Sequence, residues 1–307
     1  MTIPALREIR RLFKQARITL WTKPDLRDLF TEVDFIDDVL LAPRASWRQT
    51  VAAIRSRSFD VAILFQNAFR PALEIYAARV PIRCGYRTDG RGFLLTHAIR
   101  LDPELKHQHQ VFSYLNLVSA FGQALTGQTW VDLNSPNQIL PLSDERRKEG
   151  LAFLAEQGVD LNKRLVVVNP GATNSRAKQW LPERFAAVAD QLLARGDTNV
   201  VFIGANEEVP LAQQIAAPMR RQPILLTGQT TLRELVSILS CAQLLISNDT
   251  GPAHIGAAVG VPTLTIFGPT EHFATRPFSE RATVIRQPVW CSPCMLRDCP
   301  IDHRCMT

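Results

Sequence analysis

A run of polar residues at 247–254 has the composition of an anion-binding turn. The apolar residues before it predict a buried strand that stops at Asp249, after which Thr250 and Gly251 turn into a helix. Gly251 would let backbone amides approach a ligand closely, and a helix N-terminus offers unpaired N–H groups with a partial positive charge. A diphosphate suits this turn, with Asp249 and His254 as polar flanks. A plain strand–helix turn capped by Asp249 is the alternative.

A second candidate loop follows another predicted strand in NPGATNSRAKQWLPERF, residues 169–185. Its Pro-Gly turn leads to the hydroxyl and amide groups of Thr173, Asn174 and Ser175, and Lys178 comes next. A lysine beside a phosphate-binding turn can neutralise the charge of a leaving group. The alternative is a surface lysine with no ligand.

A third strand end is followed by the carboxylates of Glu207 and Glu208. Two adjacent carboxylates at a helix start usually complement the helix dipole, so this loop is a weaker candidate. None of the three loops contains the GxGxxG pattern of a dinucleotide-binding dehydrogenase or a Walker A lysine loop. The sequence therefore predicts another way of holding phosphates.

The first half of the chain carries Arg83, Arg87 and Arg91 near the glycine-rich turn TDGRG. Guanidinium groups bind carboxylates and phosphates through paired hydrogen bonds, so Arg87 and Arg91 are candidates for contact with an anionic ligand. For any single arginine, a solvated basic surface is the alternative explanation.

Four of the six cysteines lie in the last seventeen residues of the chain, CSPCMLRDCPIDHRCMT. Cys291, Cys294 and Cys299 together with His303 could supply a tetrahedral zinc site. The spacing is unusually compressed for such a site. Free packed thiols or an adventitious disulfide are the alternatives.

Short β-branched runs alternate with amphipathic stretches along the chain, a pattern typical of α/β proteins with parallel sheets. A turn-rich segment at 127–142 predicts a domain boundary, giving domains at 1–135 and 136–307. In the second domain the strands are continuously apolar, which predicts a Rossmann-like sheet covered on both faces. The predicted helices are 2–16, 46–58, 108–125, 143–158, 182–196, 208–219, 231–242 and 250–260. The predicted strands are 16–23, 59–67, 82–87, 97–102, 164–172, 199–205, 223–228, 244–249 and 263–269.

Composition narrows the classes of function. The 307 residues are 46% hydrophobic and 21% charged, the balance of a soluble globular protein. The sequence contains neither an apolar run long enough to span a membrane nor a secretion signal, so we expect a cytoplasmic location. The net charge of +6 favours anionic partners. We do not expect nucleic acid to be a partner, because the sequence has no surface pattern of aromatic and basic residues that would bind it.

Taken together, these motifs resemble glycosyltransferase family 9, the heptosyltransferases of lipopolysaccharide inner-core assembly, and among them the second-heptose enzymes. The resemblance rests on PGA…K-x-W-x-P-E-R-F at 170–185, L-T-G-x-T-x-L-x-E-L at 226–235 and S-N-D-T-G-P-x-H at 247–254. It implies a GT-B fold, in which two Rossmann-like domains face each other. It also implies inverting, metal-independent transfer from ADP-L-glycero-D-manno-heptose to heptosyl-Kdo2-lipid A at the inner membrane, by a monomer without a cofactor.

The resemblance also assigns roles to individual residues. Thr250 and Gly251 would hold the diphosphate, and Lys178, Asp249 and His254 would lie near the phosphate and the reacting sugar. Further donor contacts would come from Thr173, Asn174 and Glu207. The anionic acceptor that the resemblance implies would contact Arg87 and Arg91.

The family's proposed catalytic base is an Asp in a Gly-Asp loop after the first strand of the N-terminal domain. We expect that Asp and that strand upstream of Met1, and the family's last helix beyond Thr307. Loss of a central strand would leave two sheet edges unpaired. Other readings are a GT-B transferase for a different sugar nucleotide, a nucleotide-sugar epimerase, or a chain that binds donor without catalysis.

Overall fold

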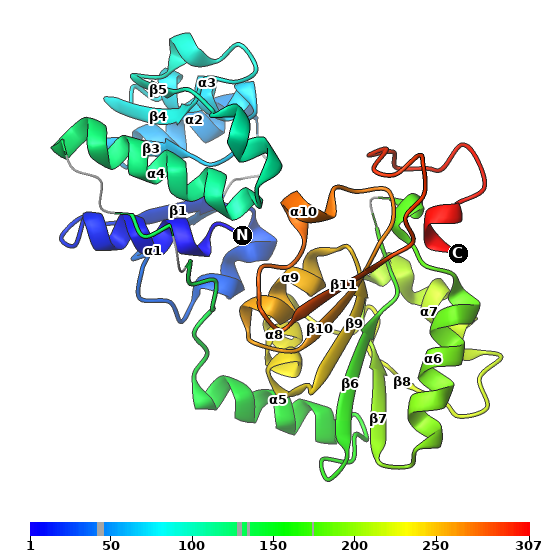
Figure 1. The fold of residues 1–307 in the computed structure, drawn as a ribbon. Helices are drawn as coiled ribbons and strands as arrows, with labels where there is room; N and C mark the ends of the chain where they lie inside the picture. Colours follow the sequence, from blue (N-terminus) through cyan, green and yellow to red (C-terminus); the bar gives the residue numbers. More distant parts are fainter. Residues whose placement is uncertain (42–45, 128–130, 134–135, 174) are drawn as a thin grey trace. The chain divides into compact units, whose positions relative to one another are not determined.

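The computed structural model describes residues 1–41, 46–127, 131–133, 136–173 and 175–307. The chain divides into two compact units, Met1–Gln138 and Ile139–Thr307 (Figure 1). Within the described residues, no helix is both long enough and apolar enough to cross a membrane.

The second unit is built on one parallel sheet, which has six strands in the described part of the chain. Its strand order is β11-β10-β9-β6-β7-β8, so the chain winds outwards from β6 in one direction and from β9 in the other. The carboxyl ends of β6 and β9 therefore flank a topological switch point, where open α/β sheets bind ligands. The strands are β6 (Arg164–Asn169), β7 (Thr198–Phe202), β8 (Ile224–Leu225), β9 (Leu244–Asn248), β10 (Thr263–Phe267) and β11 (Ala282–Arg286).

Helices cover both faces of this sheet, as its apolar strands predicted (Figure 1). Val166 and Val168 of β6 pack with α6 and α7, while Leu165 and Val167 face the other way and pack with α5 and α8. Alternate residues of a strand point to opposite faces, so a strand buried on both faces must be apolar throughout. The helices are α5 (Asp144–Glu156), α6 (Pro182–Ala194), α7 (Val209–Ala216), α8 (Leu232–Cys241), α9 (Gly251–Ala258) and α10 (His272–Thr275).

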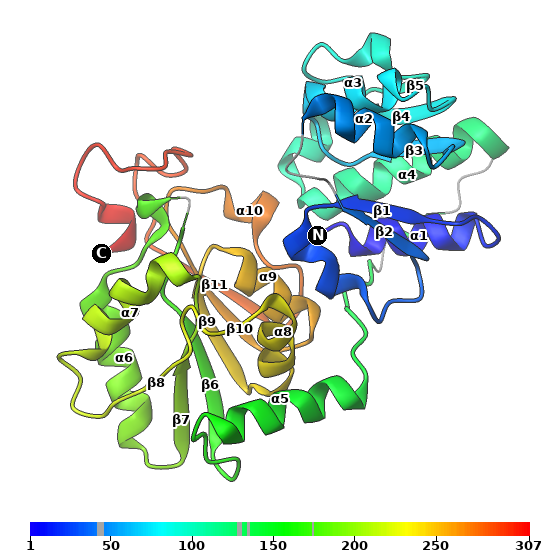
Figure 2. The ribbon, with the colours of Figure 1, turned by 180° about the vertical axis from the view of Figure 1, so that it is seen from behind.

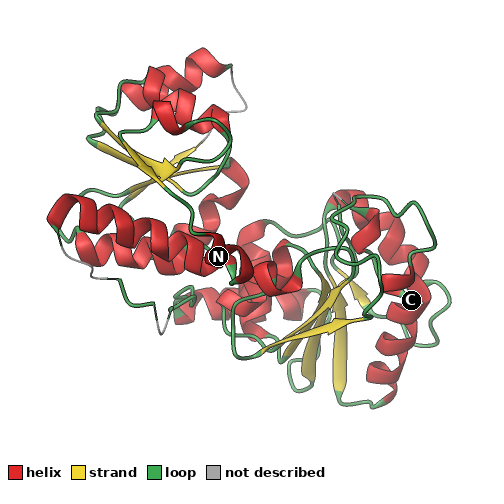
Figure 3. Cartoon of the chain, turned by 45° about the horizontal axis from the view of Figure 1, so that its top comes forward, coloured by secondary structure: helices red, strands yellow, loops and turns green. Residues whose placement is uncertain are grey.

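The first unit is also α/β, but its parallel strands form two sheets in the described residues, β1-β2 and β3-β4-β5. Within the described residues, β1 pairs with β2 and β3 pairs with β4. Figures 2 and 3 show the helices of each unit beside its own strands. The elements are α1 (Ile3–Leu12), β1 (Thr19–Thr22), β2 (Asp38–Leu41), α2 (Trp47–Arg55), β3 (Val61–Leu64), α3 (Phe69–Ala77), β4 (Ile82–Tyr86), β5 (His97–Ile99) and α4 (Gln110–Thr126).

Of the α-helices and strands in the described residues, the sequence analysis missed four: β2, α3, α10 and β11. Helix α3 has no side-chain cap, and its N-cap residue is Ala68, so it lacks the polar start signal used to recognise helices. The edge strand β11 alternates between partly buried and exposed residues and has no long apolar run. Both elements are stabilised by packing rather than by local sequence signals.

Candidate functional site

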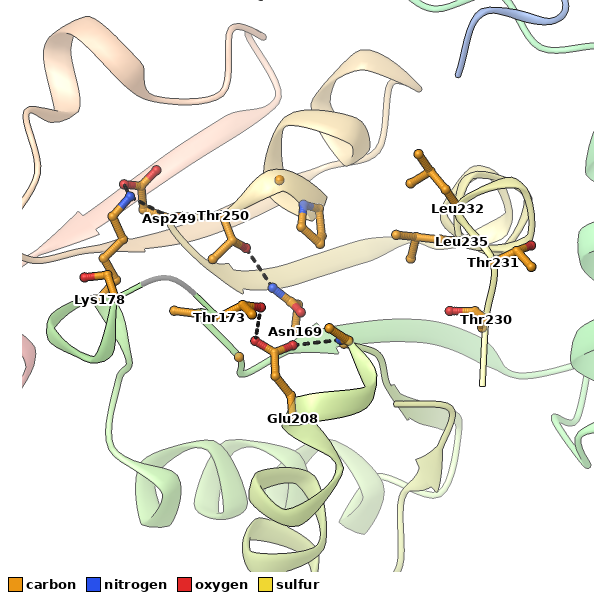
Figure 4. A pocket seen from close by; sticks show the side chains of 17 residues that line it. Asn169, Thr173, Lys178, Glu208, Thr230, Thr231, Leu232, Leu235, Asp249 and Thr250 are labelled. Atoms are coloured by element: carbon orange, nitrogen blue, oxygen red, sulfur yellow. Dashed lines mark hydrogen bonds and ion pairs between the residues drawn. The ribbon is translucent and has the colours of Figure 1, made fainter. Parts of the chain in front are cut away.

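A pocket of about 490 Å³ lies at the carboxyl ends of β6, β7 and β9, at the switch point of the second unit (Figure 4). All of its walls come from that unit. It is lined by Asn169, Gly171, Ala172, Thr173, Ser175, Lys178, Gly204, Ala205, Glu208, Thr230, Thr231, Leu232, Leu235, Asp249, Thr250, Gly251 and Pro252. Five of the predicted donor residues are thus brought together: Thr173, Lys178, Asp249, Thr250 and Gly251.

The N-terminus of α9 forms one wall of the pocket and is left open for a ligand. Thr250 is the N-cap residue, yet its side chain makes no capping hydrogen bond. Instead, Thr250 Oγ1 accepts a hydrogen bond of 2.8 Å from Asn169 Nδ2 (Figure 4). A Cβ added to Gly251 would meet no protein atom within 4 Å. The first N–H groups of a helix have no partner within it, so this terminus can receive an anion.

Lys178 and Asp249 form an ion pair at a second wall, with 2.8 Å between Nζ and Oδ2. Thr270 Oγ1 donates a hydrogen bond of 2.7 Å to the same carboxylate oxygen. The Asp249 side chain is 6% exposed and the Lys178 side chain 28% exposed. A buried carboxylate needs such partners, and the partly exposed ammonium places a positive charge at the pocket.

Glu208 forms the floor of the pocket. The sequence analysis had named its neighbour Glu207 as a donor contact. Thr173 Oγ1 donates to Glu208 Oε1 at 3.0 Å, and the Ala205 amide donates to Oε2 at 2.8 Å. Glu207 is exposed and does not line the pocket, whereas Glu208 does. A signal was present, because Glu208 stands three residues after the N-cap Ala205, the spacing at which a Glu reaches back to the cap amide.

The wall opposite Lys178 and Asp249 is the start of α8, which the sequence analysis did not assign to the site (Figure 4). Thr231 caps this helix and accepts a hydrogen bond from the Glu234 amide at 3.2 Å. Leu232 and Leu235 add an apolar surface. An apolar wall across from a phosphate-binding turn can receive a flat, uncharged ring.

Two other predicted donor residues are not placed in the pocket. His254 is partly buried in α9 and is not among the lining residues. Asn174 lies outside the described residues.

In the first unit, the two arginines that were predicted to bind an acceptor differ in their exposure to solvent. Arg87 is exposed. Arg91 is completely buried, and its guanidinium donates to the carbonyl oxygens of Tyr86, Gln66 and Ala68 and to Asn67 Oδ1. A group that is 0% exposed has no surface for a ligand. The prediction for Arg91 is therefore wrong, and its role is to join two loops at the carboxyl edge of the sheet.

The cysteine-rich segment gives no support to the zinc alternative. Among the described residues, no group of three or more His, Cys, Asp or Glu side chains comes together in a way that could hold a metal ion. His303 Nε2 lies 2.8 Å from the Ala177 carbonyl oxygen, and the cysteines are free thiols. Burial, followed by the neighbouring thiols, raises the pKa of Cys305.

Comparison with known proteins agrees with the resemblance inferred from the motifs. Residues 47–304 match glycosyltransferase family 9 (heptosyltransferase). The chain is similar to lipooligosaccharide heptosyltransferase 2 of Campylobacter jejuni subsp. jejuni serotype O:2, with 26% identity over 312 residues that cover 100% of this chain and 89% of that protein.

Two solved Escherichia coli structures have the same fold. ADP-heptose LPS heptosyltransferase II has a TM-score of 0.78 and 23% identity, covering 94% of this chain and 86% of that one. Heptosyltransferase WaaC with ADP-2-deoxy-2-fluoro heptose has a TM-score of 0.71 and 18% identity, covering 94% of this chain and 89% of that one. The predicted GT-B fold class, with Rossmann-like domains and parallel sheets, is confirmed.

Proposed function

The chain belongs to glycosyltransferase family 9, and from that membership we propose that it transfers heptose from ADP-L-glycero-D-manno-heptose to the inner core of lipopolysaccharide. The acceptor that we propose is heptosyl-Kdo2-lipid A, because the similar protein from Campylobacter jejuni is named heptosyltransferase 2. The observation that carries the proposal is the pocket, in which an uncapped helix N-terminus and a lysine flank the same space.

The walls of the pocket match the parts of such a donor. The N-terminus of α9 at Thr250 and Gly251 suits the diphosphate, and the apolar start of α8 at Leu232 and Leu235 suits the base. Lys178 lies on the side away from α8, where the sugar and its phosphate would lie (Figure 4). The solved WaaC structure carries an ADP-heptose analogue, which supports this class of donor.

We also propose that the transfer inverts the configuration at the anomeric carbon and requires no metal. In a single displacement, the acceptor oxygen forms a bond to the anomeric carbon as the bond from that carbon to the phosphate oxygen breaks, and ADP leaves. Positive groups that face the leaving phosphate stabilise its developing charge. Lys178 Nζ and the amides at the start of α9 supply that positive charge from the protein itself. The base that takes the proton from the acceptor is not assigned.

We place the acceptor contact on the first unit, at Arg87. A Cβ on Gly92 would lie 3.3 Å from the Arg87 Cβ, so the arginine adjoins the loop that carries Phe93. Phe93 is 75% exposed, and its ring centroid lies 6.2 Å from that of Phe69, which is 41% exposed. An exposed guanidinium beside two exposed aromatic rings suits a partner that has both anionic groups and acyl chains.

The donor is tested by calorimetry with ADP, UDP and GDP, followed by transfer of heptose from ADP-heptose to heptosyl-Kdo2-lipid A. We expect ADP to bind most tightly and the acceptor to gain one heptose. Preference for UDP or GDP would favour a transferase or epimerase that uses another sugar nucleotide. Tight ADP binding without transfer would favour the reading of a donor-binding chain that lacks catalysis.

We also propose that the protein acts as a monomer at the cytoplasmic face of the inner membrane, where a lipid A acceptor is anchored. Flotation with vesicles that contain the acceptor tests the location. Light scattering tests the oligomeric state, and a mass of twice the 34.4 kDa chain would contradict the monomer.

A further inference from the structure

The cysteine-rich segment is tied to the loop that carries Lys178. The Arg297 carbonyl oxygen accepts hydrogen bonds from the Ala177 amide at 2.9 Å and from Ser175 Oγ at 3.1 Å. His303 Nε2 lies 2.8 Å from the Ala177 carbonyl oxygen. Both backbone polar groups of Ala177, the residue before Lys178, are therefore bonded to the segment.

The same segment is tied to the loop that carries Thr270. Ser292 Oγ donates to the Gly268 carbonyl oxygen at 2.6 Å, and the Cys294 amide donates to the Pro269 carbonyl oxygen at 3.0 Å. Met306, at the end of the segment, packs closely on Gly268 of this loop, since a Cβ on Gly268 would lie 2.3 Å from the Met306 sulfur. Glycine at this position lets the end of the segment lie directly on the loop.

These two loops meet at one atom of the donor pocket. Lys178 Nζ and Thr270 Oγ1 both bond Asp249 Oδ2, at 2.8 Å and 2.7 Å. Lys178 directly follows Ala177, and Thr270 directly follows Pro269. The segment thus holds the residues that precede both partners of the Asp249 carboxylate.

We propose that segment 291–306 is a brace that positions Lys178 and Asp249 in the pocket. In this role its polar groups act as hydrogen-bond partners of the two loops. His303, which the zinc alternative requires as a metal ligand, is instead a positioning residue whose Nε2 group bonds the Ala177 carbonyl. The brace itself follows from the contacts above, and only its consequence for nucleotide binding rests on the proposed function.

Two variants loosen the brace, and one serves as a control. His303→Ala removes the bond to Ala177, and Ser292→Ala removes the bond to Gly268. Asp302→Ala is the matched control, because Asp302 is exposed and bonds Arg304 within the same segment. His303→Gln tests rescue, since its amide can still donate to a carbonyl oxygen.

The first measurement is amide hydrogen exchange of the free protein. We expect the loops at 175–178 and 268–271 to exchange faster in the His303→Ala, Ser292→Ala double variant and to be unchanged in Asp302→Ala. Unchanged exchange in the double variant would overturn the brace. This measurement needs no ligand, so it judges the brace whether or not the proposed function is correct.

The second measurement is ADP affinity in a double-mutant cycle. We expect His303→Ala to raise the Kd for ADP roughly two- to tenfold, as the loss of one hydrogen bond would. In a Lys178→Ala background the same change should have little further effect, because a positioning residue acts through the group that it positions. Recovery in His303→Gln would support the proposal. Independent, additive losses would overturn the role of Lys178, and absence of ADP binding in the wild type would instead refute the proposed donor.

Discussion

Gly171 and Glu208 approach each other so closely that a Cβ on Gly171 would lie 2.0 Å from the carboxyl carbon of Glu208. The glycine begins the loop after β6, and the glutamate lies in the turn after β7. Two neighbouring strand ends are thus joined through one carboxylate, which also bonds Thr173 and the Ala205 amide. The shape of the pocket floor depends on this fit.

Gly171→Ala should therefore weaken both the fold and the pocket. The added methyl group must displace Glu208 or the loop, an overpacking that costs about 1–3 kcal/mol. Denaturant unfolding and ADP calorimetry measure the two effects. Gly251→Ala is the control, because its methyl group meets no protein atom but faces the pocket. It should leave stability almost unchanged while weakening ADP binding, and equal destabilisation by both changes would contradict this account.

Glu208→Gln should destabilise the pocket floor, whereas Glu207→Gln should not. The Gln oxygen can accept from the Ala205 amide and its NH2 group can donate to the Thr173 hydroxyl, but both hydrogen bonds then lose the negative charge of the carboxylate that strengthens them. We expect the free energy of unfolding to fall by about 1 kcal/mol. The Kd for ADP should rise as well, because the pocket floor is less well held. A larger effect of Glu207→Gln than of Glu208→Gln would mean that Glu207, and not Glu208, forms the site.

Lys178→Ala should slow heptose transfer and also weaken the fold, because it leaves the buried Asp249 carboxylate without its ion-pair partner. Removal of one group that stabilises charge in the transition state costs about 10²-fold in kcat. Asp249 would keep its hydrogen bond from Thr270. Lys163→Ala is a suitable control, since Lys163 pairs with Asp160 at 3.9 Å on the surface. An equal fall in kcat for heptose transfer in both variants would exclude a specific role for Lys178.

Arg87 and Arg91 should respond differently to replacement by alanine. Arg91→Ala leaves several buried oxygens without a donor and should destabilise the first unit by about 3 kcal/mol. Arg87→Ala should leave the melting temperature unchanged and raise the KM for the acceptor while sparing the Kd for ADP. A loss of donor and acceptor binding together in Arg87→Ala would refute its assignment to the acceptor.

Cys84 should make the first unit sensitive to alkaline pH. Burial raises the pKa of its thiol from 9.0 to about 12. The unfolded thiol therefore ionises first, so stability is full below pH 9 and falls as the pH rises towards 12. The slope within that window is about 1.4 kcal/mol per pH unit. Unfolding of wild type and Cys84→Ala across this range measures the difference, and identical slopes would contradict the prediction.

The amino-acid sequence by itself determined the class of fold and the main anion-binding turn. Both depend on short-range patterns, such as the apolar run of β9 followed by Thr250, Gly251 and the start of α9. A helix N-terminus after a buried strand has the same electrostatic character wherever it occurs. Family membership followed from motifs of the same local kind.

Only the tertiary structure decided which of several similar side chains reaches the site. Glu208 faces the pocket and Glu207 does not, because Gly171, in the loop after the neighbouring strand β6, leaves room for the Glu208 carboxylate. Arg91 is buried and Arg87 is exposed, although both flank the same turn, because the oxygens that satisfy Arg91 include those of a loop distant in sequence. Such choices depend on contacts between segments far apart along the chain, which local residue patterns do not encode.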